Sequence, residues 1–444
     1  MASISALGIG SGLDLNGILD QLRDAERAKL VPIEQQMESE QTKISAYGQL
    51  QGALSQFQSS ADALNDSALY ESLSASVTGS AVSAVVGDDA QPGNYDVTVD
   101  NLATAGTLTT TGVADPQAEL TSTDSTFTIS FAGADNADVS VDIAAGSSLE
   151  DVRDAINATD NSGVSASVIF DGTEHRLALS SSETGADASI SGIDFGGTLN
   201  TDVAVAGQDA SLNVNGVAIT SATNQVEGAV QGVTLNLQET GQSTVTVEQD
   251  TRSVREAINA FVEDYNSLKN TIGELTSFDA ETGQAGDLNG DSTVRTVESR
   301  LRSVMSSGVE GEFSMLTDIG ISLELDGSLS VDEGRLDDVL ANDQAALSTF
   351  FAGTDAEGGL AGQVDATVDQ LLSANGTVKG AINGSENRVE SLGERYTSTE
   401  QSIAQTIDRY RTQFGQLDGM IAEMNQTSSY LTNQFNALDA QLGR

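Results

Sequence analysis

The C-terminal stretch VESLGERYTSTEQSIAQTIDRYRTQFGQLDGMIAEMNQTSSYLTNQFNALDAQL (389–442) carries a long seam of apolar side chains. The seam residues recur in steps of 3 and 4, which is the 3.5-residue period of a coiled coil. They are Val389, Leu392, Tyr396, Thr399, Ile403, Ile407, Tyr410, Phe414, Leu417, Ile421, Met424, Ser428, Leu431, Phe435, Leu438 and Leu442. Two successive steps of 4, from Thr399 through Ile403 to Ile407, indicate a stutter that would locally unwind a supercoil. No proline follows Pro116, so we expect one helix that packs along another long helix, of this chain or of another.

Two shorter segments repeat the same spacing. The first seam consists of Tyr47, Leu50, Leu54, Phe57, Ala61 and Leu64. The second consists of Ile258, Phe261, Tyr265, Leu268, Ile272 and Leu275. Three such helices can bury their seams against one another in a small bundle, and the three seams are the candidate assembly surface. Ordinary core packing is the equally good alternative for the two shorter ones.

The middle of the chain changes period from 3.5 to 2. Alternating apolar residues predict strands around 95–99, 127–131, 139–143, 177–179, 212–214, 233–237 and 245–247. Ser148 and Asp151 form a capping box that predicts a short helix with Leu149, Val152 and Ile156 on its apolar face. Residues 319–331 predict a hairpin with a tight turn at Asp326-Gly327, and helices are expected at 332–351 and 359–373.

These patterns predict an α+β multidomain chain, in which the N- and C-terminal helices form a coiled-coil or helical-bundle stalk with inserted β-rich domains. The expected parts are an amphipathic N-terminal segment (1–40), a stalk helix (41–75) that pairs with 251–419, the first part of a β domain (76–111), an inserted outer β domain (112–204), the second part of the β domain (205–250), a helical stalk domain with a β-hairpin near 319–331 (251–419) and a C-terminal helix (420–444).

The composition excludes several functions. Lys and Arg number 19 against 66 Asp and Glu, a net charge of −47, so we expect no nucleic-acid binding. The absence of cysteine excludes thiol catalysis, disulfides and cysteine-based metal sites. No apolar run is long enough to span a membrane. Residues 76–250 hold two cations, Arg153 and Arg176, and 25 acids, a net of 2 − 25 = −23, which suits a salty medium.

The first residues lack the basic and apolar regions of a secretory signal, so we expect none. Gly8, Gly10 and Gly12 superficially suggest a phosphate-binding loop. No strand precedes them and their spacing fits neither nucleotide motif, so we interpret them as a flexible hinge. The pattern becomes amphipathic from Leu13, with Leu15, Ile18, Leu19 and Leu22 on one stripe.

Several stretches resemble the bacterial flagellar filament-cap proteins, the flagellar hook-associated protein 2 (FliD) family. They are ISALGIGSGLDLNGILDQL (4–22), DAER (24–27), ISAYGQLQGALSQF (44–57), NVNGVAIT (213–220), GVTLNL (232–237), FVEDYNSL (261–268) and IGISLELDGSLSVDEGRL (319–336). SLEDVRDAINATDNSGVSAS (148–167) resembles the small insert that flagellins share with cap proteins. The strong acidity and the stretch 112–204 are unlike the common pattern.

The resemblance implies a structural assembly factor with no cofactor and no enzymatic activity. A ring of identical chains, a pentamer or hexamer, would sit at the tip of the flagellar filament, outside the cell. It would retain exported flagellin and promote its polymerisation. The chain would itself leave through the flagellar type III apparatus without a cleaved signal, with an export chaperone and the hook-associated junction proteins as further partners. The terminal segments, 1–40 and about 420–444, would become ordered on assembly.

Other interpretations remain open at this point. A flagellin or a hook–filament junction protein would share helical ends and β inserts, and a surface adhesin is the alternative of another class.

Residues 287–298 are similar to a calcium loop, but Ser292 stands where that loop requires glycine, so Asp291 or Ser292 as a helix cap is the better interpretation. His175, the one histidine, is expected to be a solvated strand residue. Paired carboxylates such as Asp88-Asp89 arise by chance among 66 acids.

Overall fold

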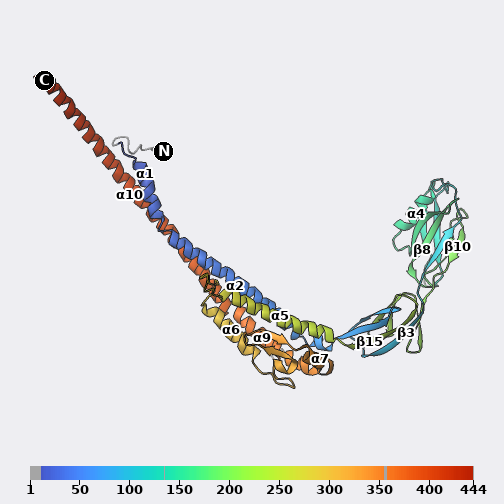
Figure 1. Ribbon diagram of the computed structural model, residues 1–444. Coiled ribbons are helices and arrows are strands. Elements are labelled where there is room, and N and C mark those ends of the chain that lie inside the picture. Colours follow the sequence, from blue (N-terminus) through green and yellow to red (C-terminus); the bar gives the residue numbers. More distant parts are fainter. Residues whose placement is uncertain (1–11, 135, 355–357, 444) are drawn as a thin grey trace. The chain divides into compact units, whose positions relative to one another are not determined.

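The computed structural model describes residues 12–134, 136–354 and 358–443. Its contacts divide the chain into two units, which we call the helical unit and the β unit. The helical unit takes in the residues up to Ser67 and those from Ser253 onward, and the β unit is Ala68–Arg252 (Figure 1). The chain therefore leaves the helical unit once and returns to it.

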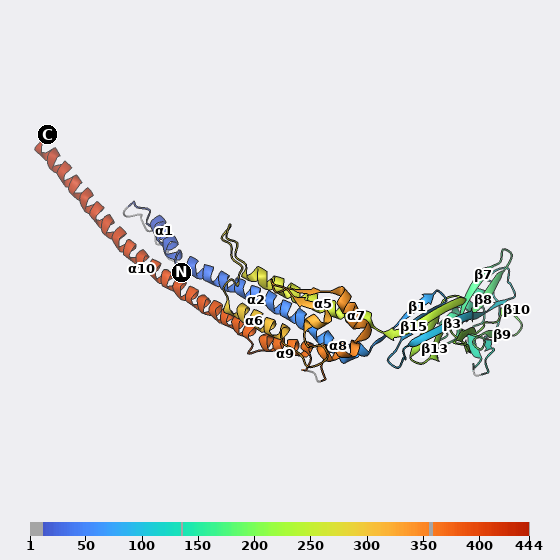
Figure 2. The same ribbon diagram turned by 60° about the horizontal axis from the view of Figure 1, so that its bottom comes forward.

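Helices from both ends of the sequence build the helical unit. They are α1 (Leu15–Arg27), α2 (Val31–Leu64), α5 (Thr251–Thr276), α6 (Ser292–Met305), α7 (Glu333–Asn342), α8 (Gln344–Phe351), α9 (Leu360–Leu372) and α10 (Thr377–Leu442). A short helix, α3 (Ser67–Glu71), follows α2 where the two units join. Helices α2 and α10 lie side by side, as both views show (Figures 1 and 2).

The heptad pattern buries the seams of α2 and α5 in one core. Leu50, Leu54 and Phe57 of α2 have no exposed surface. The Phe57 ring lies 5.1 Å from the ring of Phe261 and 5.5 Å from that of Tyr265, both on α5. Burial of one such aromatic side chain stabilises the folded state by about 2–3 kcal/mol, so these rings hold α2 and α5 together.

The expected continuous helix over 389–442 is confirmed. Helix α10 begins earlier, at Thr377, and runs for 66 residues. At 1.5 Å per residue it is roughly 100 Å long. No helix among the described residues is long and apolar enough to cross a membrane.

The hairpin at 319–331 is confirmed, but its turn is longer than expected. Its strands are β16 (Ile321–Leu323) and β17 (Leu329–Val331), and Ile319 belongs to a preceding 3-10 helix, η1 (Leu316–Ile319). The Glu324 N–H donates to the Ser328 carbonyl, and the Gly327 N–H donates to the Glu324 carbonyl. The loop therefore has three residues and ends on Gly327 at φ 87°, the left-handed position that such loops require.

One helix was expected over 332–351, and the structure has two. Helices α7 and α8 meet at Asp343, whose φ of −134° and ψ of 34° lie outside the helical region. The Asp343 N–H still donates to the Val339 carbonyl, so Asp343 ends α7 and precedes α8. Aspartate disrupts helix interiors because its side chain competes for the backbone.

The β unit contains two modules, each with its own core. In the first module, a five-stranded sheet (order β1-β15-β3-β11-β12) and a three-stranded sheet (β13-β14-β2) share one apolar cluster. The strands are β1 (Leu73–Gly79), β2 (Val82–Val86), β3 (Gly93–Asn101), β11 (Ala210–Val214), β12 (Val217–Ser221), β13 (Gln225–Val230), β14 (Val233–Leu237) and β15 (Gly241–Gln249).

The second module is inserted between β3 and β11. A four-stranded sheet (β10-β4-β8-β7), a three-stranded sheet (β6-β5-β9) and helix α4 (Leu149–Ala158) share its core. The strands are β4 (Ala105–Thr110), β5 (Ser125–Phe131), β6 (Val139–Ile143), β7 (Val164–Phe170), β8 (His175–Thr184), β9 (Ile190–Asp194) and β10 (Thr201–Val205). Strand β4 pairs with β8 and β10 and therefore belongs to the second module. The second module thus begins before the expected boundary at residue 112.

The strands expected from alternation and the capping box of α4 are confirmed. The Ser148 hydroxyl accepts from the Asp151 N–H, and the Asp151 carboxylate accepts from the Ser148 N–H. The strands that were not expected are β1, β2, β4, β7, β9, β10, β12 and β13. In β10 and β12 the side chains are exposed or half-buried on both faces and leave no alternation to recognise.

Candidate assembly surface

The seam residues of α2 and α5 lie inside the helical unit. On α2 these are Tyr47, Leu50, Leu54, Phe57 and Leu64, each at most 3% exposed. On α5 they are Ile258, Phe261, Tyr265 and Leu268, each at most 5% exposed. These side chains are already in contact with their own chain, so they leave no free surface for a partner.

The proximal part of the α10 seam is covered by α1 and by Leu30, which immediately precedes α2. Leu19 and Leu30 form an apolar cluster with Ile403 and Ile407 of α10, and Tyr396, Tyr410 and Phe414 pack half-buried at its edge. The Tyr396 hydroxyl also hydrogen-bonds Glu34 of α2, which raises the pKa of Tyr396. On α1 itself, Leu15 is buried, but Ile18 of the expected stripe is exposed.

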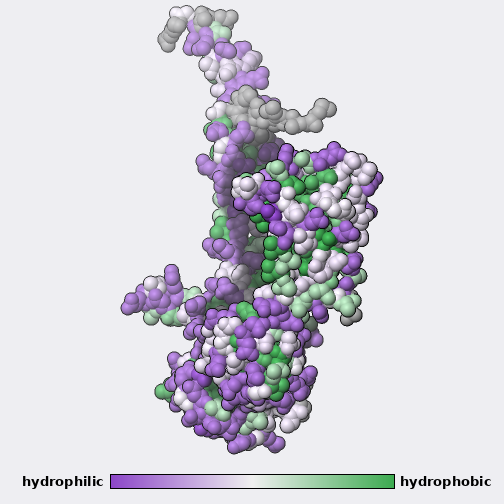
Figure 3. Space-filling model, turned by 90° about the vertical axis from the view of Figure 1, so that its right-hand side faces the viewer, coloured by the Kyte–Doolittle hydropathy of each residue, from purple (hydrophilic) through white to green (hydrophobic). Residues whose placement is uncertain are grey.

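Beyond Phe414 most of the described residues of the same seam are exposed, and Ile421 is half-buried. We call this part the distal stripe, and it consists of Leu417, Met420, Met424, Leu431, Phe435 and Leu438. Phe435 is 66% exposed and Met424 is 71% exposed. Hydrophilic residues are interspersed with the apolar ones along this part of α10, at the top of Figure 3. Large apolar side chains in a row on an exposed helix are typical of a surface that binds another protein.

The exposed part of α10 carries little charge. Residues 412–443 contain three acids, Asp418, Glu423 and Asp439, and no Lys or Arg. Met420 was not among the expected seam residues, because it falls one position before Ile421 in the heptad count. Its exposure widens the stripe by one side chain.

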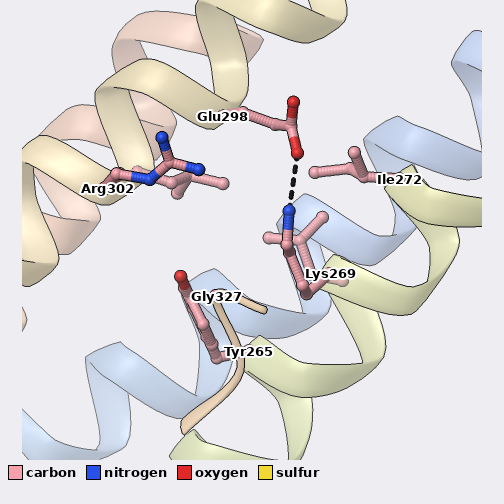
Figure 4. A pocket seen from close by; sticks show the side chains of 8 residues that line it. Tyr265, Lys269, Ile272, Glu298, Arg302 and Gly327 are labelled. Atoms are coloured by element: carbon pink, nitrogen blue, oxygen red, sulfur yellow. Dashed lines mark hydrogen bonds and ion pairs between the residues drawn. The ribbon is translucent and has the colours of Figure 1, made fainter. Parts of the chain in front are cut away.

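A small pocket lies between α5, α6 and the hairpin loop (Figure 4). Lys269 Nζ of α5 lies 2.7 Å from Glu298 Oε1 of α6, and the Lys269 stem passes close to Gly327. Burial raises the pKa of the Tyr265 phenol, which makes this hydroxyl a poor nucleophile at neutral pH. The hairpin loop therefore lies against α5 at Gly327, next to the Lys269–Glu298 ion pair.

The calcium-like segment is used to begin a helix. Asp291 Oδ1 accepts from the N–H groups of Thr293 and Val294 at the start of α6, as the cap interpretation predicts. The other carboxylate oxygen accepts from the buried Tyr47 hydroxyl at 2.7 Å. Burial raises the pKa of Asp291, but these hydrogen bonds outweigh it and hold the pKa below its ordinary value. Among the described residues, no group of three or more His, Asp or Glu side chains could hold a metal ion.

His175 lies in strand β8 as expected, but it is half-buried rather than solvated. Its ring packs 4.7 Å from that of Phe170. Next to it, the Arg176 guanidinium lies 2.7 Å from Asp171 and 2.6 Å from Asp202. The ion pair between Arg176 and Asp202 joins β8 to β10, so these charged residues stabilise the sheet.

The expected hinge lies mostly outside the described residues. Gly8 and Gly10 are among the residues that the structure does not describe. Gly12 has φ 70°, and nothing lies within 4 Å of the position that its Cβ would take. A left-handed residue just before α1 agrees with a change of chain direction there.

The fold is thus that of a structural protein, with a long helical stalk, a free apolar stripe and acidic β modules. Three family models match the chain: flagellar hook-associated protein 2 N-terminus over residues 11–106, flagellin hook IN motif over 126–183, and flagellar hook-associated protein 2 C-terminus over 207–426. The chain belongs to the flagellar hook-associated protein 2 family, the FliD proteins that cap the flagellar filament.

Full-length relatives agree with this assignment. Flagellar hook-associated protein 2 of Escherichia coli K12 is 38% identical over 98% of each chain. The A-type protein of Pseudomonas aeruginosa is 30% identical over 97% of each chain. A crystal structure of the flagellar cap protein FliD D1-D2-D3 domains from Escherichia coli matches with a TM-score of 0.60 and 34% identity, covering 77% of this chain and 99% of that one. These matches support the filament-cap interpretation and give no support to the adhesin alternative.

Proposed function

We propose that the chain acts as an oligomeric cap at the distal end of the flagellar filament, where it retains exported flagellin and promotes its polymerisation. The observation that carries this proposal is the distal stripe of α10. Its apolar residues continue a seam in which Ile403 and Ile407 pack against Leu19 of α1. No described residue covers the exposed side chains beyond Phe414, so we expect another chain to bind them.

Several partners follow from this function. Other copies of the chain, in a ring of five or six, and the terminal helices of filament subunits are the candidates for the distal stripe. Flagellin, an export chaperone and the hook-associated junction proteins are the expected wider partners. We place the protein outside the cell at the flagellum tip and expect export through the flagellar type III apparatus.

A role without enzymatic activity agrees with the chemistry of the chain. It has no cysteine, and its one histidine, His175, packs on Phe170 in a strand. In the pocket of Figure 4, the Lys269 ammonium and the Glu298 carboxylate form an ion pair with each other. A cap works by holding surfaces in place, which needs exposed apolar contacts rather than shifted pKa values.

The test is complementation of a strain from which the gene for this chain is deleted. We expect the deletion strain to release unpolymerised flagellin into the medium and the intact chain to restore filaments. The double variant Leu431→Ser/Phe435→Ser should keep its thermal midpoint, since both side chains are exposed, and fail to restore filaments.

Asn433→Ser/Asn436→Ser is the matched control, because these exposed side chains lie on the opposite face of the same turns. This control should restore filaments fully. Normal filaments in the deletion strain would overturn the proposed function. Filament growth with the stripe variant would remove the stripe from the mechanism.

The glycine hinge has its own test. We propose that Gly8, Gly10 and Gly12 let the N-terminal segment adjust its direction within the assembly. Replacing all three with alanine should slow filament elongation, because alanine at the φ of 70° seen for Gly12 costs roughly 1 kcal/mol. Measured filament lengths equal to those of the intact chain would count against the hinge.

A further inference from the structure

Two rows of opposite charge run along one short stretch of α10. Glu386, Glu390 and Glu394 repeat every four residues, and Arg388 and Arg395 are seven residues apart. All five side chains belong to exposed residues. The glutamate row spans about 12 Å of the helix and the arginine row about 10 Å, at the same level of the helix.

The two rows lie on different flanks of α10. At 100° per residue, the centres of the two rows are about 150° apart around the helix axis. The helix surface on this shorter arc is exposed, and the buried face with Ser385 and Leu392 lies on the longer arc. The arginine row faces a groove between α10 and α2, which Gln36, Ser39 and Glu40 line from the α2 side. Figure 2 shows these two helices running together.

The arginine row keeps positive charge that its own chain does not neutralise. The buried Glu40 carboxylate lies 3.0 Å from Lys43 and 3.6 Å from Arg388, so this one acid is shared by two cations. The Arg388 side chain is still 68% exposed. Among the described residues, no ion pair involves Arg395.

The glutamate row also keeps charge that the described part of its own chain does not neutralise. None of its three carboxylates makes an ion pair within the part of the chain that the structure describes. Like charges at positions i and i+4 destabilise a helix by a few tenths of a kcal/mol per pair, so the glutamate row lowers the stability of α10 at this point. Cations of another molecule that met this row would relieve the repulsion.

We propose that the two rows are the two halves of one contact between copies of this chain: the arginine groove of one copy receives the glutamate row of the next. The proposal rests on the proposed function, which requires the chain to assemble with itself. Because the halves lie on different flanks at one level, the contact is head-to-tail, the kind that closes into a ring when repeated. It also places cations between chains that each carry −47 and would otherwise repel one another.

The first test neutralises the arginine row without reversing its charge. Arg388→Gln/Arg395→Gln leaves Glu40 paired with Lys43, so we expect a folded chain with an unchanged thermal midpoint. Its apparent dissociation constant for self-assembly, measured by analytical ultracentrifugation, should rise about ten-fold, and the dependence on salt should weaken. Arg409→Gln/Arg411→Gln, the same charge change further along α10, should leave assembly unchanged.

The second test exchanges the halves between chains. Arg388→Glu/Arg395→Glu gives a chain with two acidic flanks, and Glu386→Arg/Glu390→Arg/Glu394→Arg gives one with two basic flanks. Neither should assemble alone, but an equimolar mixture should assemble in alternation. Only rings with an even number of subunits can then close, so electron-microscope images of the mixture also report on ring size.

The outcomes separate this inference from the proposed function. If the intact chain assembles and caps filaments while the row variants assemble equally well, the inference fails and the function stands. If the row variants assemble but no longer support filament growth, the groove binds carboxylates of another protein, which also overturns a contact between copies. If the intact chain neither assembles nor caps, the proposed function itself fails.

Discussion

At the residue scale, the hydrogen bond from Tyr47 to Asp291 joins positions 244 apart in the sequence. Tyr47 counts as an ordinary member of a heptad seam, and Asp291 as an ordinary helix cap. Their hydroxyl and carboxylate meet because the N-terminal end of α6 lies beside Tyr47 of α2. Burial, and then the hydrogen bond to Asp291, raise the pKa of Tyr47 to about 12.

The pH dependence of Tyr47→Phe tests this pair. Since the folded-state pKa is raised above the ordinary value of 10, the hydroxyl contributes stability fully below pH 10 and loses it as the pH rises through about 12. We expect the variant to lose about 1–2 kcal/mol of unfolding free energy at pH 7. The difference from the intact chain should shrink between pH 10 and 12 in urea titrations. Tyr430→Phe, at a 62% exposed site, is the control and should show neither effect.

Phe57 and Phe435 occupy equivalent seam positions with opposite surroundings. Phe57 is fully buried between Phe261 and Tyr265, whereas Phe435 is 66% exposed. Phe57→Ala should lower the unfolding free energy by about 3–5 kcal/mol. Phe435→Ala should leave the monomer as stable as before and weaken only self-assembly, measured by sedimentation. A loss of monomer stability in Phe435→Ala would mean that the distal stripe packs within its own chain.

At the element scale, the capping box of α4 is a local device with a measurable effect. Ser148→Ala removes the hydroxyl that accepts from the Asp151 N–H, at a cost of about 1 kcal/mol. In the β unit this corresponds to a fall in thermal midpoint of about 3 °C. Ser147→Ala, one residue earlier and outside the box, is the matched control. Equal midpoints for the two variants in calorimetry would contradict the role of the box.

The acid response of the same cap has a definite sign. Hydrogen bonds from the Ser148 backbone N–H and then from its hydroxyl hold the pKa of Asp151 below its ordinary value. The stabilisation is therefore present above pH 4 and is lost as the pH falls further.

At the scale of the whole molecule, residues 76–250 carry −23 of the net charge of −47 and contain two cations, Arg153 and Arg176. The Arg176 guanidinium pairs with Asp171, Asp202 and the more distant Glu174, and Arg153 pairs with Asp154. Most of the other described acids of the β unit are exposed. Their mutual repulsion falls as salt shortens the screening length from about 10 Å at 0.1 M to about 3 Å at 1 M.

We therefore expect the thermal midpoint of the β unit to rise with salt. The rise should be alike in sodium chloride and choline chloride, since screening does not depend on which cation is present. Midpoints that do not change with salt would show that repulsion is unimportant for stability. A rise in sodium chloride alone would indicate specific ion binding instead.

The sequence by itself determined the periodic elements. The heptads of α2, α5 and α10, the alternating strands and the capping box at Ser148 are local patterns, because side chains three, four or two residues apart share a face. The family also followed from local motifs. Strands such as β10, exposed on both faces, carry no such pattern, and the three-residue loop at Gly327 depends on the pairing of Glu324 with Ser328.

Only the tertiary structure decided which part of a seam is free. The heptad steps are the same at Ile403 and at Leu431, yet α1 covers the first and no described element covers the second. It also decided that Arg388 and Arg395 line a groove with α2 while Glu386, Glu390 and Glu394 lie on another flank. Burial depends on neighbours that are distant in the chain, and a periodic pattern records that a face is apolar without recording what covers it.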